Sequence, residues 1–321
     1  MHAAIKDFPK QFEYAPVIEN ESKLKKYSHF VVLGMGGSNL APDLLKVANP
    51  RLNITSRRNY GLPDIEPRAA KETLIIANSY SGNTEETIDG FKMAIRKNFP
   101  VAAVATGGKL LEMARKFKKP FIQLPHNGIQ PRASLGLQVK ALLRLMRDGN
   151  LTREATALAK LLKSYELERV GRAFAKKIKD NVPVIYASES NLPVAYNWKI
   201  KLNETAKIPA FVNKFPELNH NEMTGFDVQE PTAHLSRNFY FIFLKDMNDH
   251  PKIIKRMNIT ERLYRERGLP VEPMILGGKN ALYKIFSSLL LADWTSYYLA
   301  EQYGVDAEKV PMVEEFKKLV K

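Results

Sequence analysis

The chain has 321 residues, no cysteine and a formal net charge of +15 at pH 7. Without cysteine there is no disulfide framework, no thiolate nucleophile and no cysteine-based metal site. No apolar run approaches the roughly 18 residues of a membrane span, and the first residues lack a signal-peptide core, so we expect a cytoplasmic protein with no membrane partner. The basic residues are spread along predicted helix faces without interleaved aromatic rings. We therefore expect no nucleic acid partner, and a positive field that concentrates small anionic substrates.

The first half of the chain alternates strands and helices. Residues 1–28 are predicted to form a helical or irregular N-terminal segment that precedes the first domain. Apolar runs predict strands near 30–33, 74–77, 101–105 and 121–123, and this alternation is typical of a parallel sheet covered on both faces. Residues 136–178 are helix-rich, with a predicted break at Gly149-Asn150. We assign residues 29–150 to a first α/β domain.

The second half repeats this organisation. A strand at 182–187 leads into a Ser-rich loop and a predicted helix over 194–206. Later segments predict strands at 211–212, 239–244 and 274–277, and a long amphipathic helix over 282–302. The chain is therefore predicted to form two similar α/β sandwiches with parallel sheets, the second spanning residues 151–321 with its C-terminal helices.

A loop rich in hydroxyl groups follows the apolar strand Thr73–Ala77. It places Ser79, Ser81 and Thr84 within one turn of chain, directly before a predicted helix over 87–97. Free amides and hydroxyl donors at a helix N-terminus favour an anion, most often phosphate. The alternative is an ordinary capped turn, but a cap needs only one hydroxyl.

A glycine-rich loop of the same kind, Gly34–Ser38, follows the strand 29–33. It is not a dinucleotide-binding fingerprint, because Asn39 stands where that motif has its third glycine. It is not a Walker A loop either, because no Gly-Lys-Ser/Thr follows at the required spacing. Two such loops after strands of one parallel sheet converge at its carboxyl edge. Together they predict a phosphate site there.

Two further residues have both a chemical and a structural interpretation. Arg132 lies at a predicted helix start and could stabilise an anionic intermediate, although a surface arginine is the commoner case. Glu204 lies near the end of a helix that Pro209 must terminate. Its apolar neighbours could make it a useful base, whereas pairing with Lys201 or Lys207 on the helix surface is commoner.

His220 lies in the polar segment Glu217–Glu222, where histidine could shuttle protons near neutral pH. Glu217, His220 and Glu222 could also be read as metal ligands, but their spacing matches no helical zinc motif, and we expect no metal. No Gly-x-Ser-x-Gly elbow supports a serine triad.

Four segments together resemble the bifunctional phosphoglucose/phosphomannose isomerases, which belong to the phosphoglucose isomerase superfamily of sugar-isomerase (SIS) domains. They are Gly34–Ser38, Asn78–Glu85, Pro131–Gly136 and Glu217–Glu222. The resemblance implies two three-layer αβα SIS sandwiches, a homodimer with shared active sites, and reversible isomerisation of glucose 6-phosphate and mannose 6-phosphate with fructose 6-phosphate. It implies no metal or organic cofactor.

The resemblance also implies roles for individual residues. Gly37, Ser38, Ser79, Ser81 and Thr84 would hold the substrate phosphate. Glu204 would move the proton between C1 and C2, and Arg132 would stabilise the cis-enediolate. His220 of the partner subunit would help to open the sugar ring, assisted by a lysine near the C-terminus, for which Lys317 is preferred over Lys318.

Two alternatives remain open from the sequence. Another SIS-domain sugar-phosphate isomerase would not need the Asn-His-Asn-Glu segment. A SIS regulatory module that binds a sugar phosphate would call for an attached DNA-binding segment, and about 27 residues before the first strand are too few for one.

Overall fold

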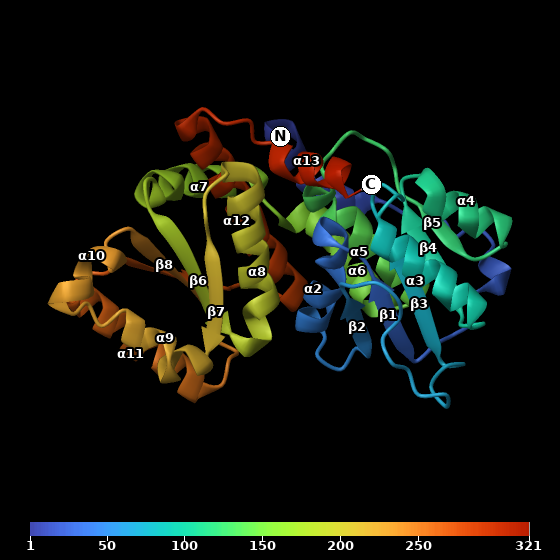
Figure 1. Ribbon diagram of the computed structural model, residues 1–321, viewed down its shortest axis with the longest axis horizontal. Helices are drawn as coiled ribbons and strands as arrows, with labels where there is room; N and C mark the ends of the chain where they lie inside the picture. The colour runs from blue at the N-terminus through green and yellow to red at the C-terminus, as the bar shows by residue number, and fades with distance from the viewer. Residues whose placement is uncertain (321) are drawn as a thin grey trace. The chain divides into compact units, whose positions relative to one another are not determined.

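The computed structural model describes residues 1–320, which form two compact α/β units (Figure 1). The N-terminal unit comprises Lys6–Lys163 with Asn280–Leu282, and the C-terminal unit comprises Met1–Ile5, Ser164–Lys279 and the chain from Tyr283 onward. Each unit is built on one parallel sheet with helices on both faces, so the predicted fold class is confirmed. The division falls after Lys163, beyond the boundary at residue 150 expected from the sequence.

The N-terminal unit has a five-stranded parallel sheet in the order β2-β1-β3-β4-β5. Four of the strands lie where the apolar runs predict them, and β2 was not predicted. Only Ile54 of its four residues is apolar and buried, so no apolar run marks it. The bounds are β1 His29–Leu33, β2 Ile54–Arg57, β3 Thr73–Asn78, β4 Val101–Ala105 and β5 Phe121–Gln123.

Helices cover both faces of this sheet. Phe91 of α3 and Leu110 of α4 pack in one apolar cluster with strand residues such as Ile75. The opposite face carries α2 and α5 (Figure 1). The helix break predicted at Gly149-Asn150 lies slightly earlier, between Met146, the last residue of α5, and Gly149, the first of α6. Asp148 caps α6 by accepting a hydrogen bond from Leu151 N. The helices are α2 Ala41–Ala48, α3 Glu85–Arg96, α4 Gly108–Lys116, α5 Leu135–Met146 and α6 Gly149–Leu161, with short 3-10 turns η1 Phe8–Glu13, η2 Glu21–Lys23, η3 Gly36–Asn39 and η4 Pro131–Ala133.

The C-terminal unit has a four-stranded parallel sheet in the order β7-β6-β8-β9. The strand expected at 274–277 begins earlier, as β9. Met257 and Tyr264 of α11, a helix absent from the sequence prediction, pack on Phe241 and Phe243 of β8. On the other side, Trp198 of α8 donates to Ser288 of α12 at 2.9 Å. The strands are β6 Val182–Ser188, β7 Phe211–Phe215, β8 Phe239–Lys245 and β9 Val271–Ile275.

The helices of this unit include the long predicted one, α12. They are α7 Ser164–Ile178, α8 Leu192–Lys201, α9 Glu222–Gly225, α10 Ala233–Ser236, α11 Pro251–Glu266, α12 Ala281–Tyr303 and α13 Pro311–Leu319, with α1 His2–Lys6 at the start of the chain. Short turns lie at η5 Glu189–Asn191, η7 Glu217–His220 and η8 Glu230–Thr232, and a π-helical turn, η6, spans Leu202–Ala206.

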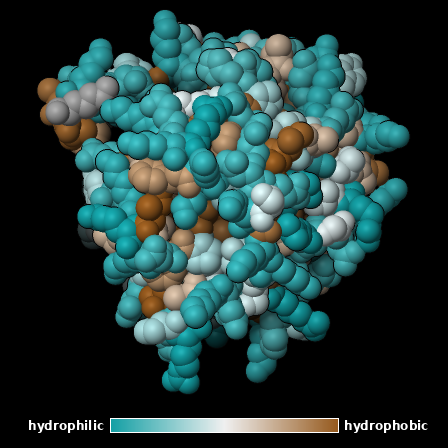
Figure 2. Space-filling view, turned by 90° about the vertical axis from the view of Figure 1, so that its right-hand side faces the viewer, coloured by the Kyte–Doolittle hydropathy of each residue, from teal (hydrophilic) through white to brown (hydrophobic). Residues whose placement is uncertain are grey.

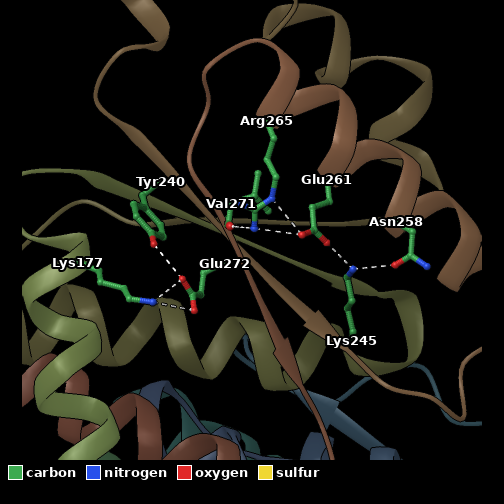
Figure 3. A network of polar contacts seen from close by, with 8 residues as sticks. All are labelled: Lys177, Tyr240, Lys245, Asn258, Glu261, Arg265, Val271 and Glu272. Carbon is green, nitrogen blue, oxygen red and sulfur yellow. Dashed lines mark hydrogen bonds and ion pairs between the residues drawn. The ribbon is translucent and has the colours of Figure 1, made fainter.

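A polar network fastens α11 to the sheet (Figure 3). Lys245, at the end of β8, donates to Glu261 Oε2 at 2.6 Å and to Asn258 Oδ1 at 2.8 Å. Glu261 also accepts from Arg265 at 3.1 Å. The helix is therefore held to the sheet by charge as well as by its apolar face.

The described surface agrees with the expectation of solvent-facing basic side chains. Arg115, Lys116 and Lys118 are exposed, as are Lys176 and Lys177. The face shown in Figure 2 is mainly hydrophilic, with small scattered apolar patches. Among the helices of residues 1–320, we find none that combines the length and apolarity needed to cross a membrane.

Candidate active site

The two predicted anion loops lie against each other at the carboxyl edge of the N-terminal sheet. Their strands, β1 and β3, are neighbours, with Leu33 opposite Ala77. Ser38 Oγ accepts from the amide of Tyr80 at 2.9 Å, and Asn78 Nδ2 donates to the Ser38 carbonyl at 2.5 Å. The sequence prediction that these loops converge is confirmed.

The hydroxyl groups of the second loop are held by the loop itself. Ser79 Oγ accepts from Gly82 N at 3.2 Å and lies 2.8 Å from Thr84 Oγ1, while Ser81 Oγ accepts from Asn83 N at 3.2 Å. Thr84 precedes α3 but caps no amide of that helix. Since Ser81 uses its hydroxyl only as an acceptor, its hydrogen is available to donate to an anion, and the Ser79–Thr84 pair has one further hydrogen to donate.

The exposure of these hydroxyls differs. Ser79 is fully buried and Ser38 is nearly so, whereas Ser81 is exposed. Glu85 and Glu86 occupy the first turn of α3 and already place negative charge at its N-terminus. The attraction for an anion must therefore come mainly from the loop donors rather than from the helix dipole.

A third segment, not predicted from the sequence, supports the hydroxyl loop. Gly82 has φ +71°, and an added Cβ would lie 1.8 Å from the carbonyl oxygen of Gly107, after β4. Asn83 Oδ1 accepts from Lys109 N, at the start of α4, at 3.1 Å. Only glycine fits at position 82, and the loop is fixed by its neighbours on both sides.

Arg132 lies beside the glycine loop. An added Cβ on Gly37 would lie 2.7 Å from Arg132 N and 2.8 Å from the Pro131 carbonyl carbon. Gln138 of α5 links the segments, because Nε2 donates to the Pro131 carbonyl at 3.2 Å and Oε1 accepts from Asn78 Nδ2 at 3.0 Å. Arg132 is only 3% exposed, so the surface-arginine interpretation is wrong. A buried guanidinium acts on an anion in a low-dielectric setting.

The other three candidates lie in the C-terminal unit. Glu204 is half-buried in the π-helical turn η6, a local widening that is frequent at functional sites. Lys201 is not its surface partner, because the Lys201 ammonium lies 2.6 Å from Asp293 in a buried pair. Lys207 Nζ contacts the main-chain carbonyls of Glu204 and Thr205 at 2.6 and 3.3 Å.

His220 and Lys317 are both exposed. His220 ends the turn η7, and within residues 1–320 no hydrogen bond to its ring is found. Lys317 lies on α13 and pairs with Glu314 at 2.8 Å. Glu222, one of the residues that could be read as a metal ligand, instead binds Tyr186 and Asn213 through its carboxylate.

Comparison with known proteins identifies the family. A bifunctional phosphoglucose/phosphomannose isomerase of Aquifex aeolicus is 32% identical over 327 residues, covering 100% of this chain and 98% of that protein. The chain belongs to this family. A family model described as the bacterial phospho-glucose isomerase C-terminal SIS domain matches residues 168–320. The resemblance stated from the four motifs is thereby confirmed.

Two further similarities bear on function and fold. A D-glucosamine-6-phosphate 4-epimerase of Sulfolobus acidocaldarius is 26% identical, covering 96% of this chain and 94% of that protein. The solved structure of a glucosamine-6-phosphate deaminase from Thermotoga maritima has a TM-score of 0.68 at 17% identity, covering 97% of both chains. At that identity the structural likeness shows the fold, which is the fold predicted.

Proposed function

We propose that this protein reversibly isomerises glucose 6-phosphate and mannose 6-phosphate with fructose 6-phosphate. The observation that carries the proposal is the meeting of Ser38, the hydroxyl loop and buried Arg132 at one sheet edge, in a chain of the phosphoglucose/phosphomannose isomerase family. Hydroxyl donors fixed by backbone contacts suit a phosphate, and a nearby fixed positive charge suits an enediolate.

The phosphate is the handle that orients the reacting carbons. We assign it to the backbone at Gly37 and to the hydroxyls of Ser38, Ser79, Ser81 and Thr84. Ser38 and Ser81 each have a hydroxyl hydrogen to donate, and the Ser79–Thr84 pair has one more, because one of the two hydroxyls donates to the other. Binding energy gained at the phosphate positions C1 and C2 for proton transfer.

The chemistry of the sugar explains why one site can serve two aldoses. The carboxylate of Glu204 takes the proton from C2 of the open-chain aldose, and the electron pair moves onto the C1 oxygen to give a cis-enediolate. Return of the proton to C1, with transfer of the hydroxyl proton from O2 to O1, gives the ketose. The enediolate has lost its configuration at C2, so protonation there from either face gives glucose or mannose 6-phosphate. Arg132 stabilises the negative oxygens.

Ring opening must precede this step, since the cyclic sugar has no carbonyl. We assign it to His220 of the partner subunit, with Lys317 assisting. Proton transfer and a cationic electrophile suffice for the reaction, so we propose that it needs no metal or organic cofactor. Because sugar phosphates are charged metabolites of the cell interior, we also propose a cytoplasmic location.

A homodimer is part of the proposal. The helix that bears Lys317, α13, exposes Met312 at 80%, Phe316 at 62% and Leu319 at 78%. Apolar side chains exposed to this extent on one helix are typical of a surface that a protein partner covers. Contact with a second copy would shield them.

The test is an assay of purified protein with fructose 6-phosphate, measuring glucose and mannose 6-phosphates separately, with and without EDTA. We expect both products and no effect of the chelator. Glucosamine 6-phosphate is the comparison substrate, because one relative is named as its 4-epimerase. Turnover of glucosamine 6-phosphate alone, or of a different ketose phosphate alone, would indicate another SIS-domain enzyme. Binding without turnover of any sugar phosphate would indicate a regulatory module.

A further inference from the structure

The segment that carries His220 is anchored on both sides of the histidine. Before it, Asn219 Nδ2 donates to Thr260 Oγ1 of α11 at 2.8 Å. After it, Asn221 Oδ1 accepts from Glu222 N at 2.6 Å and caps the short helix α9. His220 itself is exposed. The neighbours of His220 are therefore engaged by the fold, while its imidazole is directed to solvent.

Glu222 is an anchor with two contacts. One carboxylate oxygen accepts from Tyr186 Oη and the other from Asn213 Nδ2. Tyr186 and Asn213 are register partners on the adjacent parallel strands β6 and β7. A single carboxylate thus binds the edge strand β7 and its inner neighbour β6 at once.

The setting of Tyr186 makes this contact hard to replace. Its ring is fully buried and packs edge-on or tilted against four other rings, those of Phe215, Phe241, Phe243 and Tyr264. Burial, reinforced by Tyr264 and Glu222, raises the pKa of Tyr186 above its ordinary value, so the hydroxyl remains a donor. Hydrogen bonds to an ionised carboxylate are stronger than neutral ones.

We propose that Tyr186, Asn213 and Glu222 form a positioning network that fixes His220 for ring opening. Glu222 lies two residues after the histidine, so holding its carboxylate to β6 and β7 holds the backbone that presents the imidazole. The three residues act through His220 and do not touch the sugar. This inference rests on the proposed function of His220, and it gives the Glu222 carboxylate a structural task in place of metal binding.

The substitution Tyr186→Phe tests the network because it removes one hydroxyl and leaves the buried ring. The matched control is Tyr240→Phe on β8, whose hydroxyl donates to Glu272 at 3.3 Å on a different part of the same sheet (Figure 3). With Tyr186→Phe we expect faster amide hydrogen exchange across residues 217–222, and with the control no change there. No increase, or an equal increase in both variants, would overturn the proposal.

Kinetics separate positioning from a general loss of stability. With Tyr186→Phe we expect kcat on cyclic glucose 6-phosphate to fall roughly 10-fold to 100-fold with little change in KM. The comparison substrate is 5-deoxyfructose 6-phosphate, which cannot close a ring because it lacks the 5-hydroxyl. Its turnover should be unchanged, and an equal loss on both substrates would contradict a role through His220.

Combination with His220→Ala gives the sharpest result. If the network works through the histidine alone, adding Tyr186→Phe to His220→Ala should cause no further loss on the cyclic substrate. A further loss equal to that in the wild-type background would refute the proposal.

Glu222→Gln should retain more activity than Glu222→Ala, since the amide can still accept one hydrogen bond. If the wild-type protein isomerised no sugar phosphate, the proposed function would fail, and hydrogen exchange alone would decide whether the network orders the loop.

Discussion

At the scale of single residues, the direction of a hydroxyl hydrogen decides whether a serine can bind an anion. Ser38, Ser79 and Ser81 each accept a hydrogen bond from a backbone amide. That contact uses an acceptor lone pair and leaves the hydrogen to point elsewhere. A serine that donates its hydroxyl hydrogen to a main-chain carbonyl, as Ser134 Oγ does to the Pro131 carbonyl at 2.8 Å, has no hydrogen left for a phosphate.

The phosphate assignment is tested most cleanly at Ser81 and Thr84, because Ser79 is buried and its loss would disturb the loop. We predict that Ser81→Ala and Thr84→Ala each raise KM for fructose 6-phosphate. The rise should correspond to a loss of binding free energy of roughly 1.5–3 kcal/mol, the range for a hydrogen bond to a charged group. Steady-state kinetics measure the effect. Thr232→Ala, an exposed hydroxyl in the other unit, is the control. An unchanged KM and kcat in the double variant would remove the loop from the site.

Glu204 is predicted to be the base that moves the proton. Its half-buried position in the π-helical turn η6 motivates the assignment. Glu204→Gln should preserve substrate binding and lower kcat by at least about 10²-fold. Exchange of the C2 hydrogen of glucose 6-phosphate with deuterium oxide, followed by NMR, is the direct measurement. Continued exchange at the wild-type rate would rule out this base. Glu266→Gln, an exposed change on α11, should have no effect.

At the scale of elements, strands were predictable and contacts between distant loops were not. Most of the strands lie where apolar runs predict them, because a parallel strand covered on both faces is apolar along most of its length. The strand β2 was missed because only Ile54 of its four residues is apolar and buried, and the helix α11 because it exposes much of its length. The motifs predict which loops converge, but the close approach of Gly37 to the backbone of Pro131 and Arg132, far away in the sequence, is encoded by no local pattern.

The turn that carries Glu204 is a second feature that the sequence alone did not predict. The sequence predicts a continuous helix over 194–206, but the helix widens into a π turn after Lys201. Lys201 is 2.6 Å from Asp293 of α12, and both side chains are buried. Removing one partner of a buried pair is costly, so this contact fixes where α8 meets α12. Such a contact between distant segments is invisible to helical periodicity.

The attachment of α11 to its sheet should depend on pH. Burial raises the pKa of Glu261, but hydrogen bonds and attraction from Lys245 and Arg265 outweigh it and hold the pKa below its ordinary value. The unfolded chain therefore binds this proton more tightly. The contribution to stability is complete above the unfolded pKa of about 4.5 and is lost as pH falls through the lower folded value.

Glu261→Gln makes this measurable. We predict that it lowers the free energy of unfolding by about 1–3 kcal/mol at pH 7, as expected for charge-assisted hydrogen bonds that are mostly shielded from solvent. Urea denaturation of both proteins should show the difference shrinking as pH drops below the unfolded pKa. A difference that stayed constant across this range would assign the effect to packing rather than to charge. Glu266→Gln, on the exposed side of α11, serves again as the control.

At the scale of the whole molecule, the proposed active site requires two chains. In the proposed dimer, Glu204 of one subunit works with His220 of the other, so each site draws on both copies. Mixing Glu204→Gln and His220→Ala proteins then distributes the defects unevenly. In a mixed dimer one site contains both substitutions and the other contains neither.

We predict that unfolding and refolding a mixture of these two inactive variants restores activity on glucose 6-phosphate. Each verified heterodimer should reach about half the activity of a wild-type dimer, since one of its two sites is intact. Differently tagged subunits allow the heterodimer to be purified, and size-exclusion chromatography should show its dimeric mass. Each variant refolded alone is the control and should stay inactive. Purified heterodimers without activity would instead place Glu204 and His220 of the same chain in one site.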